Sequence, residues 1–227
     1  MEQNGLEAFV ALWLAASVLS AAWVTWDVTG GGRHQRMTVM AVVWPLTMLY
    51  WGPPGLVFYV SLGRAVRVTA SRSHDEDDKS VAPMWHAAFK GAMHCGAGCA
   101  LGDFIGEWVA FGTTFRAAGS ALGGKLLLAF VLAYLIGIAF QFFSIAPMRG
   151  LGLRDGIVAA VKADTLSLVA YEMGMFACMV AFAMAFPGLE PINLRYWLLM
   201  QLAMLAGFIT TYPVNWWLIS HGMKEKM

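Results

Sequence analysis

The chain has little charge: Asp, Glu, Lys and Arg together make up 13% of its 227 residues, roughly half the share found in soluble domains. The formal net charge is +1, which gives no electrostatic basis for binding nucleic acid. Hydrophobic residues, in contrast, make up 59% of the chain. This composition predicts an integral membrane protein whose main surroundings are the lipid bilayer.

Cysteine is also scarce. Three cysteines cannot form a disulfide framework, and all three fall in apolar segments, so they are interpreted as free thiols or metal ligands. The C-x-x-C-H motif that attaches haem is missing from the sequence. Residues 1–7 lack the basic start of a cleavable signal peptide, so none is expected.

Long apolar runs dominate what is present. A membrane-spanning helix needs about 20 mostly apolar residues. Six stretches meet that length, which predicts an all-α, polytopic six-helix transmembrane bundle forming a single domain over residues 1–227. The expected spans are residues 7–28, 37–62, 85–111, 126–148, 160–186 and 196–220.

Two features qualify this prediction. The second span contains Pro45, Pro53 and Pro54, so it can be two short pieces, but its length favours one kinked helix at about 1.5 Å per residue. Residues 63–84 are expected to form a cytoplasmic loop. Its hydrophilic run, residues 71–80, is interpreted as a solvated loop, with an acidic docking site or a metal-gathering tract around His74 as alternatives.

The loops also predict an orientation, because cytoplasmic loops are rich in Lys and Arg. With six spans, nine basic residues fall on the side of both termini and five on the other side. Both termini are therefore expected in the cytoplasm. The nine are Arg64, Arg67, Arg72, Lys79, Arg149, Arg154, Lys162, Lys224 and Lys226, and the five are Arg33, Arg36, Arg116, Lys125 and Arg195.

The third span carries an unusual number of polar residues, in the stretch KGAMHCGAGCALGDFIGEW (90–108). On a helix, residues four apart lie on one side, so the residues at positions 95, 99, 103 and 107 form a stripe of sulfur and carboxylate groups. Gly98, Gly102 and Gly106 form a second stripe with two overlapping G-x-x-x-G spacings. Such spacings let another helix pack closely, so the polar stripe is expected to face the bundle interior.

His94, Cys95 and Cys99 bring an imidazole and two sulfurs within one helical turn. Thiolate and imidazole favour a soft metal ion, most of all copper, with zinc as an alternative. A disulfide between cysteines four apart on a helix is poorly aligned. We therefore predict a metal site at these three residues, with Asp103 and Glu107 forming a polar lane from it toward the periplasm.

Further polar residues are expected around this site from the fifth and sixth spans. Ionised groups inside a membrane cost about 2.5–3.5 kcal/mol each, so they need partners. Asp164 and Glu172 are expected to pair with Lys90 or to relay protons as the metal moves. The full set of surrounding residues is Lys90, Asp164, Ser167, Glu172, Met175, Cys178 and Asn215.

Three segments carry a resemblance to a known family: HCGAGCALGD (94–103), SIAPMRGLGLRDGIVAAVKADTLSLVAYEMGM (144–175) and YPVNWWLISHGMKEKM (212–227). They resemble the bacterial membrane family of the domain of unknown function DUF4396, over the chain from about Trp85 onward. The resemblance implies a bacterial inner membrane and, through copper-oxidase-like neighbours of some members, copper handling with other membrane or periplasmic proteins. It carries over His94, Cys95, Cys99 and Asp103, and more weakly Asp164, Ser167, Glu172 and Asn215.

The leading interpretation is a protein that binds copper within the bundle and passes it across the membrane or to a partner, rather than an enzyme. A membrane oxidoreductase is an alternative, in which the site holds a redox metal or a haem iron with axial ligands from His86, His94 or His221. A second alternative is a structural subunit of a larger membrane complex, in which the same residues serve only packing.

Overall fold

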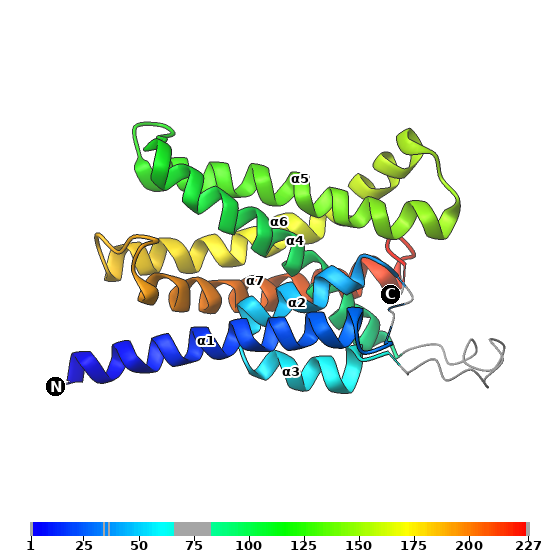
Figure 1. Cartoon of the computed structure of the whole chain (residues 1–227). Helices are drawn as coiled ribbons and strands as arrows, with labels where there is room; N and C mark the ends of the chain where they lie inside the picture. The colour runs from blue at the N-terminus through cyan, green and yellow to red at the C-terminus, as the bar shows by residue number, and fades with distance from the viewer. Residues whose placement is uncertain (1, 34, 36, 66–82, 226–227) are drawn as a thin grey trace.

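The computed structural model describes residues 2–33, 35, 37–65 and 83–225, which fold into helices joined by short turns (Figure 1). The expected all-helical fold is confirmed. Most of the predicted loop over residues 63–84, including His74, lies outside the described residues. The helices are α1 (Glu2–Thr29), α2 (Met40–Trp51), α3 (Pro54–Phe58), the π-helical turn η1 (Tyr59–Gly63), α4 (Met84–Thr113), α5 (Ala121–Arg149), α6 (Leu153–Ala185) and α7 (Leu194–Ser220).

Four of these helices, α1, α5, α6 and α7, are long and apolar enough to cross a membrane. They expose large apolar side chains on their outer faces, such as Leu12 (72% exposed) and Met184 (79% exposed). Such extensive exposure of apolar groups is unfavourable in water and suits contact with lipid. The membrane character of the chain is thus supported, with four candidate spans instead of the six expected.

The second expected span is not one kinked helix; α2 and α3–η1 form a hairpin. Trp44 near the start of α2 packs on Tyr59 at a ring-centroid distance of 5.5 Å, and Gln35 Nε2, just before α2, donates to the carbonyl of Gly63 at 3.0 Å. Both ends of the hairpin therefore lie at the same end of the bundle, as Figure 1 also shows for α2 and α3. This correction changes the topology of the chain.

The reversal is built by Gly52, Pro53 and Pro54. Gly52 has φ +66° and ψ −159°, a conformation open essentially to glycine alone, and Pro54 starts the next helix at a position where a missing N–H does no harm. At the other end Asp27 of α1 accepts two hydrogen bonds from Arg64, from Nε at 2.9 Å and Nη2 at 2.8 Å. The residue that follows the hairpin is thus hydrogen-bonded to α1 near the end of that helix.

The start of α1 and the end of α7 lie at opposite ends of the bundle (Figure 1). Glu7 near the start of α1 pairs with Arg195 at the start of α7 at 3.1 Å, and α7 then runs 27 residues, or about 40 Å, to the other end. The expectation of both termini on one side does not fit this arrangement. It depended on counting the hairpin as a crossing.

Helix α4 lies at the centre and contacts α2, α5, α6 and α7. Its glycine stripe faces α5: a Cβ atom on Gly98 would lie 2.9 Å from Gly137 Cα, and one on Gly102 would overlap the backbone of Ala133. The predicted close approach of another helix is confirmed. Because the two helices are antiparallel, this register sets Gln141 of α5 opposite His94 of α4, one turn further along.

Candidate functional site

All the ionisable groups of the central part of α4 are buried. His94, Asp103 and Glu107 are each no more than 2% exposed. Asp164 and Glu172 of α6, the neighbouring helix, are equally buried. We call these five residues the polar column. From His94 to Glu107 it extends along thirteen residues of α4, or about 20 Å at 1.5 Å per residue.

The centre of the column is acidic. Asp103 lies within electrostatic range of both Glu172 and Glu107. The carboxylate oxygens of Asp103 and Glu172 are buried and make no hydrogen bond of regular geometry in the described part of the chain, although the Cys99 thiol lies against Glu172. The hydroxyl of Tyr171, next to them, is likewise unpartnered among described residues.

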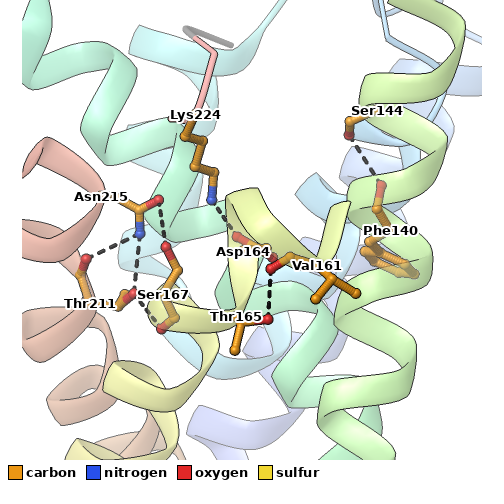
Figure 2. Close-up of polar contacts among 9 residues, drawn as sticks. All are labelled: Phe140, Ser144, Val161, Asp164, Thr165, Ser167, Thr211, Asn215 and Lys224. Atoms are coloured by element: carbon orange, nitrogen blue, oxygen red, sulfur yellow. Dashed lines mark hydrogen bonds and ion pairs between the residues drawn. The ribbon is translucent and has the colours of Figure 1, made fainter. Parts of the chain in front are cut away.

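One end of the column is closed by Lys224, which follows α7. Its Nζ donates to Asp164 Oδ1 at 2.5 Å, and both side chains are 0% exposed. Figure 2 shows the lysine reaching from the C-terminal segment down to the carboxylate on α6. Gly222, with φ +68°, lets the chain turn back toward the bundle after α7. His94 lies within electrostatic range of this ion pair.

A hydrogen-bonded group from α6 and α7 lies beside this end of the column (Figure 2). Ser167 donates to Asn215 Oδ1 at 3.2 Å, and Thr211 donates to the carbonyl of Ser167 at 2.8 Å. Asn215 Nδ2 in turn donates to the Thr211 carbonyl at 3.1 Å. Ser167 and Asn215 thus join α6 to α7 by hydrogen bonds, and their expected place around a metal site stays a prediction.

The other end of the column is closed by Lys125 of α5. Its Nζ lies 3.4 Å from Glu107 Oε2 and 5.2 Å from the centre of the Tyr196 ring. This ion pair is looser than the first, because 3.4 Å is long for a hydrogen bond and the Lys125 side chain is 20% exposed. The two ends are therefore closed to different degrees.

A cavity lies close to each of these ion pairs, at its own end of the bundle. Near Lys224, a cavity of about 620 Å³ is lined by Arg149, Lys162, Ala163 and Met223, and Ala163 and Met223 are the chain neighbours of the ion-paired residues. Near Glu107, a cavity of about 240 Å³ is lined by Lys125 itself and Tyr196. We call these the inner and the outer vestibule.

Unpartnered polar atoms concentrate along the column. A buried polar group without a hydrogen bond costs about 1–3 kcal/mol, so a chain retains several of them in one place only where something else satisfies them. Within the described residues, the buried side chains of the column and its surroundings that make no hydrogen bond of regular geometry are those of His94, Asp103, Gln141, Tyr171 and Glu172, and Asp164 has one such oxygen, Oδ2.

The predicted metal ligands are only partly brought together. Cys99 lies beside Cys95 and near Glu172, whereas His94 lies toward Phe140 of α5 and the Asp164 ion pair. Across the described residues no group of three or more His, Cys, Asp and Glu is placed to hold a metal ion. The metal site stays a prediction that this geometry does not favour.

The remaining expected residues fall in several places. Met175 is buried in the core, and Cys178 is half-buried on α6. Lys90 is half-buried on α4, one turn from His86. The expected partner of Asp164 was Lys90, whereas the structure shows an ion pair of Asp164 with Lys224. His221 is exposed beyond α7, so the histidines of the haem alternative do not face one another at one depth.

Sequence reasoning missed four residues of this site: Lys224, Lys125, Gln141 and Tyr196. Lys224 was counted only among the basic residues that set the orientation, because it follows the last apolar run. Lys125 could have been noticed as a charge within the first turns of an apolar helix. Gln141 is the one amide in the apolar centre of α5, which is itself a signal in a membrane helix.

Comparison with known proteins adds a family but no activity. No curated protein matches the chain, and no solved structure does. A family model described as a domain of unknown function, DUF4396, matches residues 84–224. The match runs from the start of α4 to Lys224 and so includes the whole polar column and both lysines. It covers more than half of the chain, which therefore belongs to the DUF4396 family.

Proposed function

We propose that the protein moves protons across a membrane through the polar column, with Lys224 and Lys125 closing its two ends. The observation that carries this proposal is the acidic centre: Asp103 and Glu172 are buried and make no regular hydrogen bond in the described structure, between two ends that each hold a lysine–carboxylate pair. Intramembrane carboxylates and histidines of this kind are typical of proton relays.

The chemistry of the column favours a proton over a soft metal. Its groups are four carboxylates and an imidazole, with the amide of Gln141 and the phenols of Tyr171 and Tyr196 beside them, and all of these exchange or hydrogen-bond protons. A buried carboxylate can be neutralised by a proton or by a neighbouring cation, and a relay alternates between these two states. Glu172 and Asp103 would hold the proton in the centre, and Glu107 and Asp164 would pass it to the vestibules when their lysines move away.

The difference between the ends indicates which state the structure represents. The Lys224–Asp164 pair is fully buried, while Lys125 is partly exposed at the outer vestibule. In the proposed cycle, the structure with Lys224 bound to Asp164 is the state in which the column is closed on the inner side. Opening the inner end requires Lys224 to leave a contact that has no access to solvent, so we expect this to be the slower step.

For the orientation, we propose that α1, α4, α5, α6 and α7 cross the membrane and that the α2–η1 hairpin enters from the cytoplasm. The sequence supports this through its basic residues. Counted along the sequence alone, ten belong to the segments that connect or follow helices whose described ends are at the Lys224 end, against three for the other end. The ten are Arg33, Arg36, Arg64, Arg67, Arg72, Lys79, Arg149, Arg154, Lys224 and Lys226, and the three are Arg116, Lys125 and Arg195. The excess of basic residues at one end, ten against three, is larger than the nine against five counted for six spans. It puts the C-terminus in the cytoplasm. The expected membrane is still a bacterial inner membrane.

The proposal is tested with purified protein in liposomes that contain a pH-sensitive dye, with proton entry driven by a potassium-diffusion potential. Wild-type protein should acidify the lumen, and Glu172→Gln should reduce the rate by roughly tenfold or more, which is about 1.4 kcal/mol in the barrier. Glu7→Gln is the matched control, since Glu7 is an exposed carboxylate outside the column. Equal rates for wild type and empty liposomes would refute the proposal.

Copper transfer remains a second candidate because the thiols of Cys95 and Cys99 lie side by side in the core. It predicts that protein purified without added metal contains copper in stoichiometric amount. Replacing either cysteine by serine should abolish binding, since a soft ion prefers thiolate to a hydroxyl, while Asp103→Asn should retain the metal and lose only its transfer. Bound metal retained in both serine variants would exclude these ligands.

A further inference from the structure

A third cavity lies outside the polar column, on the side of the bundle where the hairpin turns back. It has a volume of about 410 Å³ and is lined by residues of α1, α2, α4 and α7, among them Leu14, Leu49, Ala100 and Met204. Apolar cavities of about 150 Å³ already bind small hydrocarbons. This lateral pocket is therefore large enough for an extended apolar group.

The lateral pocket exists because the hairpin stops inside the bundle. The carbonyl of Leu49, near the hairpin tip, accepts a hydrogen bond from Gln201, which lies seven residues into α7, or about 10 Å from its first residue. Beyond the tip, α1, α4 and α7 continue without α2 between them. The space that a full crossing helix would fill is left to another occupant.

The few polar side chains at the pocket are already hydrogen-bonded to the protein. Gln201 accepts from Trp13 at 2.8 Å and donates to the Leu49 carbonyl at 2.5 Å. Ser17 donates to the Trp13 carbonyl at 2.9 Å, and Tyr50 to the Met93 carbonyl at 3.3 Å. A polar ligand or ordered water would find few free partners here, since a buried water needs two to four of them.

The pocket opens onto the lipid-facing surface of the bundle. Its lining residues Val18, Leu49 and Phe104 are exposed by 58%, 42% and 49%. At the end near the start of α7, Trp108 and Trp197 line it and stack with ring centroids 6.0 Å apart. Tryptophans of this kind mark the level of lipid headgroups, so the pocket extends from the headgroup level toward the hairpin tip.

We propose that the lateral pocket is a binding site for one acyl chain of a bilayer phospholipid, which enters from the leaflet opposite the hairpin's mouth and has its headgroup at Trp108 and Trp197. An empty pocket would forfeit the dispersion contacts of its whole lining, and water is excluded by the lack of free polar partners. The lipid is the apolar molecule present at that surface at high concentration. It completes the helix packing on the side where α2 is too short to do so.

The test uses protein in nanodiscs made with a phospholipid that carries a photoactivatable diazirine in its acyl chain. After illumination, the labelled residues are mapped by peptide mass spectrometry. Labelling should concentrate on residues 14–18, 100–108 and 197–204, above the level found at Leu135, which is 61% exposed on the distant face of α5. Ala100→Phe fills part of the pocket and should lower labelling at Leu14 and Met204 by roughly tenfold, equivalent to about 1.4 kcal/mol.

Ala181→Phe is the matched control, because Ala181 is exposed on α6 and does not line the pocket; its labelling map should equal that of wild type. If Ala100→Phe does not fold, the wild-type map alone decides. Labelling that merely follows exposure, or a pocket signal unchanged by Ala100→Phe, would overturn the proposal. So would an isoprenoid or other non-phospholipid molecule extracted in stoichiometric amount. None of these outcomes depends on proton transport.

Discussion

The Lys224–Asp164 ion pair offers a sharp test of the structure, because both charges are 0% exposed and the contact is 2.5 Å long. Removing one partner of a buried pair leaves an uncompensated charge and costs about 3–5 kcal/mol. Lys224→Met and Asp164→Asn should each lower the free energy of unfolding by that amount. The double variant leaves only a neutral buried amide, so its loss should be smaller, about 1–3 kcal/mol.

The measurement is equilibrium unfolding in mixed micelles titrated with a denaturing detergent, followed by tryptophan fluorescence. The chain supplies a matched control on the same segment, since Glu225 pairs with Arg149 at 2.6 Å but the two side chains are 33% and 42% exposed. Such exposed pairs contribute about 0–1 kcal/mol, so Glu225→Gln should change little. If the losses of the two single variants simply add in the double variant, the ion pair is not the reason for the burial of Lys224.

Three further outcomes follow from the fold. A reporter fused before α1 should read as external, while one fused after Met227 should read as cytoplasmic; two cytoplasmic readings would contradict the re-entrant hairpin. Gly102→Ala should lower the free energy of unfolding by about 1–3 kcal/mol, because the added methyl would overlap the backbone of Ala133. Gly112→Ala is the control: a methyl there meets nothing within 4 Å, so it should be neutral or slightly stabilising in the same titration. Gly52→Ala should cost about 1–3 kcal/mol because its φ of +66° is strained for any side chain, and an unchanged midpoint would show that the turn relaxes.

Much of the fold could be predicted from the sequence, because local composition is sufficient for it. The apolar runs that became α1, α5, α6 and α7 are long enough to be recognised one at a time. The glycine stripe of α4 also predicted a close helix contact, since a four-residue spacing places glycines on one face whatever the partner is. These are properties of single helices, which do not depend on the rest of the chain.

The topology depended on the tertiary structure. Pro53 and Pro54 were read as a kink, because the length of the apolar run is the same for a bent helix and for a hairpin. What distinguishes the two is the contact of the second half with the first, such as Trp44 with Tyr59. Once that contact is known, the second expected span is seen to be a hairpin, and the count of basic residues changes with it.

For the candidate site, too, some features could be predicted from the sequence and others depended on the tertiary structure. The sequence alone determined that His94, Cys95, Asp103 and Glu172 lie in apolar helices and therefore need partners. Neighbouring positions on a helix point about 100° apart, so His94 and Cys95 can face different neighbours. Only the tertiary structure decided which neighbours these are, with His94 toward Phe140 of α5 and Cys95 beside Cys99. It also decided that Lys224, sixty residues away in the chain from Asp164, is the charge that neutralises that carboxylate. Local periodicity fixes which residues share a face, but partners distant in sequence are set by how the helices pack.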